Sequence, residues 1–252
     1  MSTSPESSSS KPRPAPGPEP VPSTFIRIRT TLPRRPLPPN SARQPILTPR
    51  LTLRPLVPED LSALHELRTQ PEVMHWTARG LPDENLDETQ AKLDPFLPPR
   101  DEGTFNVAIC DRETGALIGI GGCHIFRSTF GWPEVGYMFR KEVWGKGLGT
   151  EFLRGWMAAW DALEREEVEM EVDERTAGEE VRGPDGKVRE QLIAVTATGN
   201  DKSQGVLGKA GFKWFTTWLA EDLTKSARPD NLIELPTYRH FPGAKKEEGV
   251  LN

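Results

Sequence analysis

Three glycines at every second position separate a strand-like segment from a helix-like segment, and this arrangement constrains the fold more than any other feature. Residues 144–150 read Trp-Gly-Lys-Gly-Leu-Gly-Thr, between the strand-like residues 134–139 and the helix-like residues 151–160. Glycines at the start of a helix leave backbone N–H groups bare, and the helix dipole favours negative charge at the same place. The pattern therefore predicts a strand–turn–helix unit whose turn binds phosphate oxygens.

Two common phosphate-binding motifs differ from this segment. The Walker loop has Lys followed by Ser or Thr, whereas Lys146 is followed by Gly147. The dinucleotide-binding fingerprint has two residues between its second and third glycines, whereas only Leu148 separates Gly147 from Gly149. We therefore expect a phosphate-bearing ligand of another class.

A second motif follows about 50 residues later. Residues 191–198 are mostly apolar and β-branched, which predicts a buried strand. Asn200 is suited to cap the next helix, and Gly211 to end it in a left-handed conformation. Ser203 lies in the first turn of that predicted helix.

Together, the two motifs resemble those of the GCN5-related N-acetyltransferase (GNAT) family, whose usual loop is Gln or Arg, two residues, Gly, one residue, Gly or Ala. Gly147 and Gly149 match this loop, and Trp144 replaces the leading Gln or Arg. The Trp-Gly-Lys-Gly sequence resembles the branch of ribosomal-protein N-terminal alanine acetyltransferases (RimJ/RimL-like). The resemblance covers residues 46–241 and implies acetyl-CoA as co-substrate.

The resemblance also implies which residues contact acetyl-CoA. The pyrophosphate would lie on the glycine loop, and the pantetheine arm beside the second motif and the end of the strand at 134–139. The implied cofactor-binding residues are Met138, Phe139, Arg140, Trp144, Gly145, Lys146, Gly147, Leu148, Gly149, Thr150, Asn200 and Ser203.

The resemblance and the element order predict an α/β (α+β) fold like that of acyl-CoA N-acyltransferases. We expect a mixed, twisted central sheet of six to seven strands with helices on both faces. Residues 50–56, 104–110 and 116–126 are expected strands, and residues 59–70 and 83–97 expected helices. Trp156 and Trp160 stand one helical turn apart and are expected in the core.

Acetyl transfer to an amine requires a group that accepts the amine proton and a partner for the departing sulfur. Glu134, at the start of the strand before the loop, is the first candidate for the base, because several relatives use a carboxylate there; His124 is an alternative. Many relatives place a tyrosine on the last helix near the position of Leu207, which is not a tyrosine. Ser203 is then the candidate partner for the sulfur; the alternatives are water or no dedicated acid.

Composition limits the other function classes. The net charge of −5 gives no indication of nucleic-acid binding. Cys110 and Cys123 cannot form a disulfide framework, and no apolar run approaches the ~18 residues of a membrane span. We expect a cytoplasmic protein with no membrane or nucleic-acid partner. Organelle targeting by the Arg-containing N-terminus is less favoured, because its prolines oppose an amphipathic helix.

The chain divides into an extension, one domain and a tail. Residues 1–45 hold 12 of the 25 prolines and are expected to be mostly disordered, although residues 24–32 alternate and can add an edge strand. Residues 46–241 form the predicted domain, and residues 242–252 a flexible tail. Residues 164–190 are an acidic insertion, which is either a solvated surface or an attractor for a basic acceptor.

Three functional hypotheses remain open from the sequence. The first is an acetyl-CoA-dependent N-acetyltransferase for a primary amine, such as a protein N-terminus or basic peptide. The second keeps this chemistry with a small amine: a polyamine, an amino acid or an antibiotic. The third is a non-catalytic module that binds coenzyme A. The sequence does not choose the acceptor or the oligomeric state.

Overall fold

The computed structural model of the protein describes residues 24–222 and 232–243. Of the extension predicted to be mostly disordered, residues 1–45, residues 1–23 lie outside the described residues, as does most of the predicted tail. From residue 24 on the extension is ordered: Phe25–Pro33 form a strand and Leu37 is buried in the core. None of the described helices is long and apolar enough to cross a membrane.

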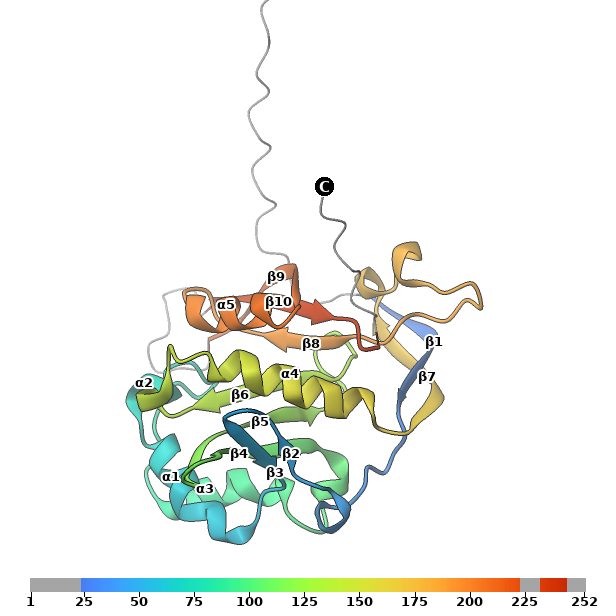
Figure 1. The fold of residues 1–252 in the computed structure, drawn as a ribbon. Helices are drawn as coiled ribbons and strands as arrows, with labels where there is room; N and C mark the ends of the chain where they lie inside the picture. Colours follow the sequence, from blue (N-terminus) through green and yellow to red (C-terminus); the bar gives the residue numbers. More distant parts are fainter. Residues whose placement is uncertain (1–23, 223–231, 244–252) are drawn as a thin grey trace, which may run out of the picture.

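An eight-stranded mixed sheet forms the centre of the molecule (Figure 1). In spatial order its strands are β2 (Ile46–Leu47), β3 (Leu51–Arg54), β4 (Phe105–Asp111), β5 (Leu117–Ile125), β6 (Glu134–Phe139), β8 (Leu192–Val195), β10 (Leu232–His240) and β9 (Lys213–Glu221). The predicted α/β fold is confirmed, but the predicted count of six to seven strands is one too low. The additional strand is β2, which is only two residues long and therefore shows no alternation in the sequence.

Helices cover both faces of this sheet. Helices α4 (Leu148–Asp161) and α5 (Asp201–Lys209) pack on one face, where a cluster of apolar side chains contains the stacked rings of Trp156 and Trp160. Helices α1 (Leu61–Arg68), α2 (Pro71–Met74) and α3 (Leu86–Leu93) lie on the other face, over β4 and β5. The prediction that both tryptophans belong to the core is confirmed, because neither is exposed.

Strands β6 and β8 are the only parallel neighbours in the described sheet, and they pair at a single position. Glu134 of β6 pairs with Ile193 of β8, and the Ile193 N–H donates to the Pro133 carbonyl over 2.8 Å. Further along β6 no residue pairs with β8. The two strands are therefore unpaired from Glu134 toward the glycine loop, and we refer to this unpaired stretch between β6 and β8 as the gap.

The inserted segment folds as a second, smaller sheet. Strand β7 (Arg165–Asp173) pairs antiparallel with β1 (Phe25–Pro33), so the alternating N-terminal segment joins the insertion and not the edge of the central sheet. The register sets Arg27 opposite Glu171 and Arg29 opposite Glu169. Behind β1 and β7 a separate apolar cluster includes Ile28, Val172 and Trp132. Cross-strand arginines thus offset part of the acidic charge of the insertion.

Candidate active site

The glycine loop leads directly into α4. Gly145 and Gly147 have φ angles of 75° and 78°, in the left-handed region that only glycine adopts readily. Gly147 is the N-cap of α4, and no side chain accepts a hydrogen bond from the N–H groups of the first turn. At Gly149 an added Cβ would lie 3.2 Å from Val206 of α5, so glycine permits the close approach of the two helices. The loop therefore offers bare N–H groups at a helix N-terminus.

Neighbouring side chains hold the loop in place. The Trp144 indole donates to the Phe139 carbonyl over 2.8 Å, and the Lys202 ammonium lies 4.9 Å from the centroid of its ring. On the opposite side, the Arg50 guanidinium donates to the Lys146 carbonyl over 2.9 Å and forms an ion pair with Glu151 of α4. The loop is thus fixed to both β6 and the β2–β3 turn.

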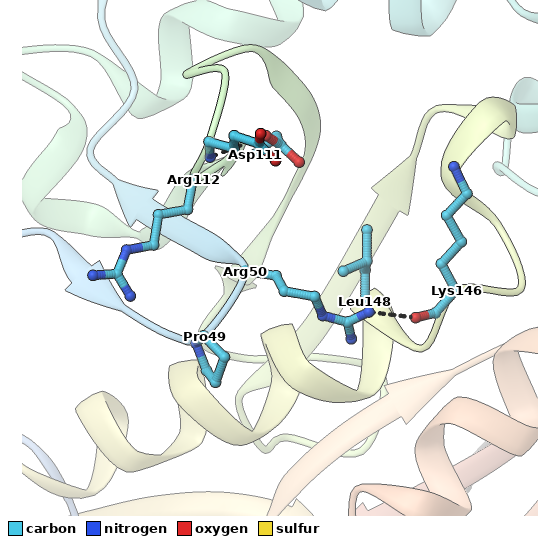
Figure 2. Close-up of a pocket in the computed structure, with 7 residues that line it drawn as sticks. Pro49, Arg50, Asp111, Arg112, Lys146 and Leu148 are labelled. Atoms are coloured by element: carbon cyan, nitrogen blue, oxygen red, sulfur yellow. Dashed lines mark hydrogen bonds between the residues drawn. The ribbon is translucent and has the colours of Figure 1, made fainter.

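A pocket of about 360 Å³ adjoins the loop beside the β2–β3 turn. Figure 2 shows Arg50 directed at the Lys146 carbonyl, while the side chains of Arg112 and Lys146 point away from each other. Arg112 donates to the Thr48 carbonyl over 2.9 Å. The remaining lining residues are Pro49, Asp111, Glu113 and Leu148. The lining carries three bases and two acids, and Arg50 is paired with Glu151, so the charges around this pocket nearly balance.

The peptide groups of β6 are divided between β5 and the gap. The Arg140 N–H donates to the Ile118 carbonyl of β5 over 2.8 Å. Because hydrogen-bonded pairs alternate along antiparallel strands, Met138 also directs its peptide groups to β5, whereas Tyr137 and Phe139 direct theirs to the gap. The Phe139 carbonyl already accepts the Trp144 indole N–H. Of the three positions expected from the resemblance, only Phe139 has a backbone N–H facing the gap.

The side chains of these three positions also point away from the gap. Arg140 donates to the Ala63 carbonyl and to Glu66 of α1, and Met138 packs against the cluster beneath the same helix. The Phe139 ring packs between the sheet and α4. Any contact of these residues with a ligand in the gap is therefore made by the backbone.

Glu134 lies at the closed end of the gap, on the face of the sheet opposite α4. Burial raises the pKa of Glu134 to about 7, although 19% of its side chain remains exposed. His124 of β5 lies beside it, with Nε2 4.0 Å from Glu134 Oε1, and burial lowers the pKa of this histidine. Gly136 makes room for the imidazole, because an added Cβ would lie 3.2 Å from His124 Cε1. The structure thus places both candidate bases together.

Cys123 does not belong to this group. Its side chain is fully buried in the cluster beneath α4, on the face opposite His124, and burial raises the pKa of its thiol. Cys123 and His124 therefore face opposite sides of the sheet and do not form a Cys–His pair. Within the described part of the chain, no group of three or more His, Cys, Asp or Glu residues is arranged to hold a metal ion.

Ser203 lies across the gap on α5. As expected, Asn200 caps this helix: its Oδ1 accepts the Ser203 N–H over 3.2 Å. Gly211 follows the helix with φ of 93°, also as expected. The Ser203 hydroxyl lies 2.9 Å from the Tyr137 hydroxyl, which reaches over from β6.

Tyr137 is the residue of this site that the sequence analysis missed. The family resemblance pointed to a tyrosine on α5 near Leu207, which is buried in the core. The alternation of side chains along β6 indicates that Tyr137 lies on the same face as Val135 and Phe139, toward α4 and α5. The sequence did not indicate that its hydroxyl meets α5.

Comparison with known proteins fits this geometry. The family model of the acetyltransferase (GNAT) domain matches residues 50–213, well over half of the chain. The chain belongs to the GNAT acetyltransferase family. By this membership the protein is an N-acetyltransferase, and the glycine loop and the gap are its candidate active site.

Solved structures share the fold of this acetyltransferase at low sequence identity. RimL, a ribosomal L7/L12 alpha-N-protein acetyltransferase in complex with coenzyme A, is 13% identical, with a TM-score of 0.55 over 80% of this chain and 100% of RimL. Spermidine N-acetyltransferase from Vibrio cholerae, in complex with coenzyme A and spermine, is 16% identical, with a TM-score of 0.54 over 77% and 97% of the two chains. A GNAT acetyltransferase from Bacillus anthracis is 17% identical, with a TM-score of 0.53 over 80% and 100%.

Proposed function

We propose that this acetyltransferase transfers the acetyl group of acetyl-CoA directly to a primary amine, and that the amine is a protein or peptide N-terminus. The observation that carries the proposal is the gap between β6 and β8. It has bare helix N–H groups at its open end and a largely buried carboxylate of raised pKa at its closed end. A donor bound along the gap would present its thioester near Glu134.

The residues of the glycine loop fit a pyrophosphate. The N–H groups of residues 145–150 would donate to phosphate oxygens, and the positive end of α4 would favour their charge. Lys146 and Arg112 border the adjoining pocket and would add positive charge for the remaining phosphate. The Phe139 N–H and the first turn of α5 face the part of the gap that a pantetheine arm would fill.

Acetyl-CoA supplies an acetyl group activated as a thioester. The protein has to accept the proton of the attacking amine and stabilise the negative charge that develops on the departing sulfur until the sulfur is protonated. An ammonium group cannot attack, so Glu134 would accept the amine proton, directly or through His124 or water. A pKa of about 7 leaves a large ionised fraction at neutral pH and makes the carboxylate a stronger base than an ordinary glutamate. The Ser203 hydroxyl would donate to the departing sulfur.

The pKa of Glu134 favours an α-amine over a side-chain amine. An α-amine has a pKa of about 7.7–8.0 and a lysine amine of about 10.4. Proton transfer from the ammonium group to Glu134 is therefore unfavourable by roughly one pKa unit for an α-amine and by more than three pKa units for an alkyl amine. RimL acts on a protein α-amine and spermidine N-acetyltransferase on a polyamine, so this fold serves both classes.

The inserted segment gives less support to a strongly cationic acceptor than its composition suggests. Glu167 forms an ion pair with Lys187, Glu171 with Arg127, and Glu190 with Arg165. Arg27 also stands opposite Glu171, and Arg29 stands opposite one further acid, Glu169. Much of the acidic charge is thus offset within the protein, and we do not assign acceptor selection to the insertion.

Mass spectrometry of acceptor panels tests the proposal. The enzyme with acetyl-CoA should acetylate short peptides at their α-amine and leave N-terminally blocked peptides with free lysines nearly unmodified. Matched pairs of peptides that differ only in the N-terminal block provide the control. Acetylation of spermidine or free lysine side chains in place of α-amines would overturn the acceptor class, and binding of acetyl-CoA with no turnover on any amine would overturn the catalytic proposal.

A further inference from the structure

Tyr137 spans the gap at the point where β6 and β8 have separated. Its ring lies against Phe139 and Phe152, with centroid distances of 6.2 and 6.0 Å, and its hydroxyl reaches α5. Gly121 of β5 makes this position possible, because an added Cβ there would lie 2.8 Å from Tyr137 Cβ. Packing therefore fixes the ring and aims its hydroxyl at Ser203.

The Ser203 hydroxyl has one hydrogen-bond partner among the described residues, the Tyr137 hydroxyl, and either oxygen can be the donor. The two acceptors near the Tyr137 hydroxyl both belong to Ser203: Oγ at 2.9 Å and the carbonyl oxygen at 3.4 Å. A serine hydroxyl has one proton and two lone pairs. When the phenol donates to Oγ, it occupies a lone pair, and the serine proton has to point elsewhere. Among the described residues, Ser203 Oγ has no second partner.

Tyr137 is the favoured donor of this bond, because a phenol is a stronger acid than an aliphatic alcohol and its oxygen is a weaker acceptor. Burial raises the pKa of Tyr137 to about 12, with the Ser203 hydrogen bond acting in the opposite direction, so the phenol stays protonated at neutral pH. A free thiol has a pKa of about 8.5. A phenol this weak as an acid would not hand its proton to a thiolate, but it can orient a neighbouring hydroxyl.

We propose that Tyr137 is a positioning residue that turns the Ser203 hydroxyl proton into the gap, toward the sulfur of coenzyme A. This inference rests on the proposed function, because it requires the pantetheine arm to lie between β6 and α5. No covalent bond changes at Tyr137. The Ser203 O–H donates a hydrogen bond to the sulfur as negative charge develops, and water supplies the proton that the thiolate finally takes.

The chain contains its own matched control. It has two tyrosines, and the second, Tyr238 of β10, donates to Gln204 Oε1 on the same helix over 3.1 Å. Tyr137→Phe and Tyr238→Phe each remove one phenol hydroxyl that bonds the first turns of α5. Only the first of these hydroxyls contacts Ser203.

The test measures the pKa of the coenzyme A thiol bound to the protein, by following thiolate ultraviolet absorbance as a function of pH; no acceptor is needed. On the wild-type protein the thiol pKa should lie below its value in solution. Tyr137→Phe and Ser203→Ala should each raise it by about one unit, the value expected for loss of one hydrogen bond to a charged group. The double variant should raise it no further than Ser203→Ala, and Tyr238→Phe should leave it unchanged.

The outcomes separate this inference from the proposed function. If the wild-type protein does not bind coenzyme A, the proposed function falls and this inference with it. If it binds coenzyme A but Tyr137→Phe leaves the thiol pKa at the wild-type value, or adds its effect fully to that of Ser203→Ala, only the role of Tyr137 is overturned.

A second variant keeps the test decisive where Tyr137→Phe fails to fold. Fluorotyrosine incorporated into the Tyr238→Phe chain labels position 137 alone and leaves its ring and hydrogen bond in place. The more acidic phenol is a stronger donor to Ser203 and should lower the thiol pKa further. An unchanged thiol pKa in this protein would overturn the inference.

Discussion

Among single residues, Glu134 links the shape of the gap to its chemistry. The backbone of Glu134 forms the single pair between β6 and β8, and its carboxyl group is buried enough to raise its pKa to about 7. Charge repulsion does not contribute, since burial is the cause of this shift. The same position therefore closes the gap and holds the group proposed to receive the amine proton.

Replacing Glu134 by Gln should lower turnover with little effect on acetyl-CoA affinity. Loss of a general base costs about 10²–10⁴-fold in rate. Wild-type turnover should rise with pH through about 7 as the carboxyl group ionises. The deficit of Glu134→Gln should be larger at pH 7 than at pH 9, where an α-amine is already deprotonated. Rate profiles against pH measure this, and an equal deficit at both pH values contradicts the base role.

The same substitution should raise the stability of the folded protein although it lowers turnover. Glu134 has a raised pKa in the folded state, so between its ordinary value of 4.5 and about 7 the folded protein binds more protons than the unfolded chain. The free energy of unfolding therefore falls as pH rises through this range. Glu134→Gln should have the wild-type melting temperature near pH 4 and a higher one at pH 8. At pH 8 its free energy of unfolding should exceed that of the wild type by about 1–3 kcal/mol. A lower melting temperature at pH 8 would rule out this cost of burial.

A charged substitution at Gly147 tests whether the glycine loop binds the pyrophosphate of acetyl-CoA. Gly147→Asp introduces a carboxylate beside the expected pyrophosphate, and at an effective dielectric constant of about 20 such repulsion amounts to several kcal/mol. We expect acetyl-CoA to bind about 100-fold more weakly. Gly147→Asn is the matched control, since Asn tolerates the same left-handed backbone without charge. Calorimetric affinities that are equal for the two variants would refute the assignment.

At the scale of elements, the sequence predicted the parts whose signals are local. The glycine loop, the Asn200 cap, the Gly211 terminus and the buried Trp156–Trp160 pair follow from spacing and backbone preference, and the structure has them. The missed features depend on contacts distant in sequence. Nothing within β1 indicates that its partner is β7, about 140 residues away, and nothing in β6 indicates that Tyr137 meets α5.

Strand β1 should contribute to stability through its buried face. Ile28 is 3% exposed in the cluster behind β7, and truncation of such a side chain costs about 2–5 kcal/mol. Ile28→Ala should lower the free energy of unfolding by this amount, while the exposed neighbour Arg27→Ala should change it by less than about 0.5 kcal/mol. Denaturant titration measures both. Equal effects would mean that β1 does not belong to the folded core.

At the scale of the whole molecule, the three apolar clusters do not completely cover the face of the central sheet opposite α4 and α5. Helices α1 to α3 cover β4 and β5, and the insertion with β1 covers β8 and β10. Between them, Glu134 and His124 remain partly exposed, with 19% and 35% of their side chains accessible. A donor along the gap and an acceptor from this face would meet at Glu134, which suits direct transfer without an acetylated protein intermediate.

Titration calorimetry of the wild-type protein with acetyl-CoA, and separately with NAD and ATP, tests the central claim most directly. The account predicts micromolar binding of acetyl-CoA with one site per chain, and much weaker binding of the other two, because of the three only acetyl-CoA has a pantetheine arm that would fill the gap between β6 and β8. Equal affinity for all three ligands would mean that the loop recognises phosphate alone. Absence of acetyl-CoA binding would contradict the account.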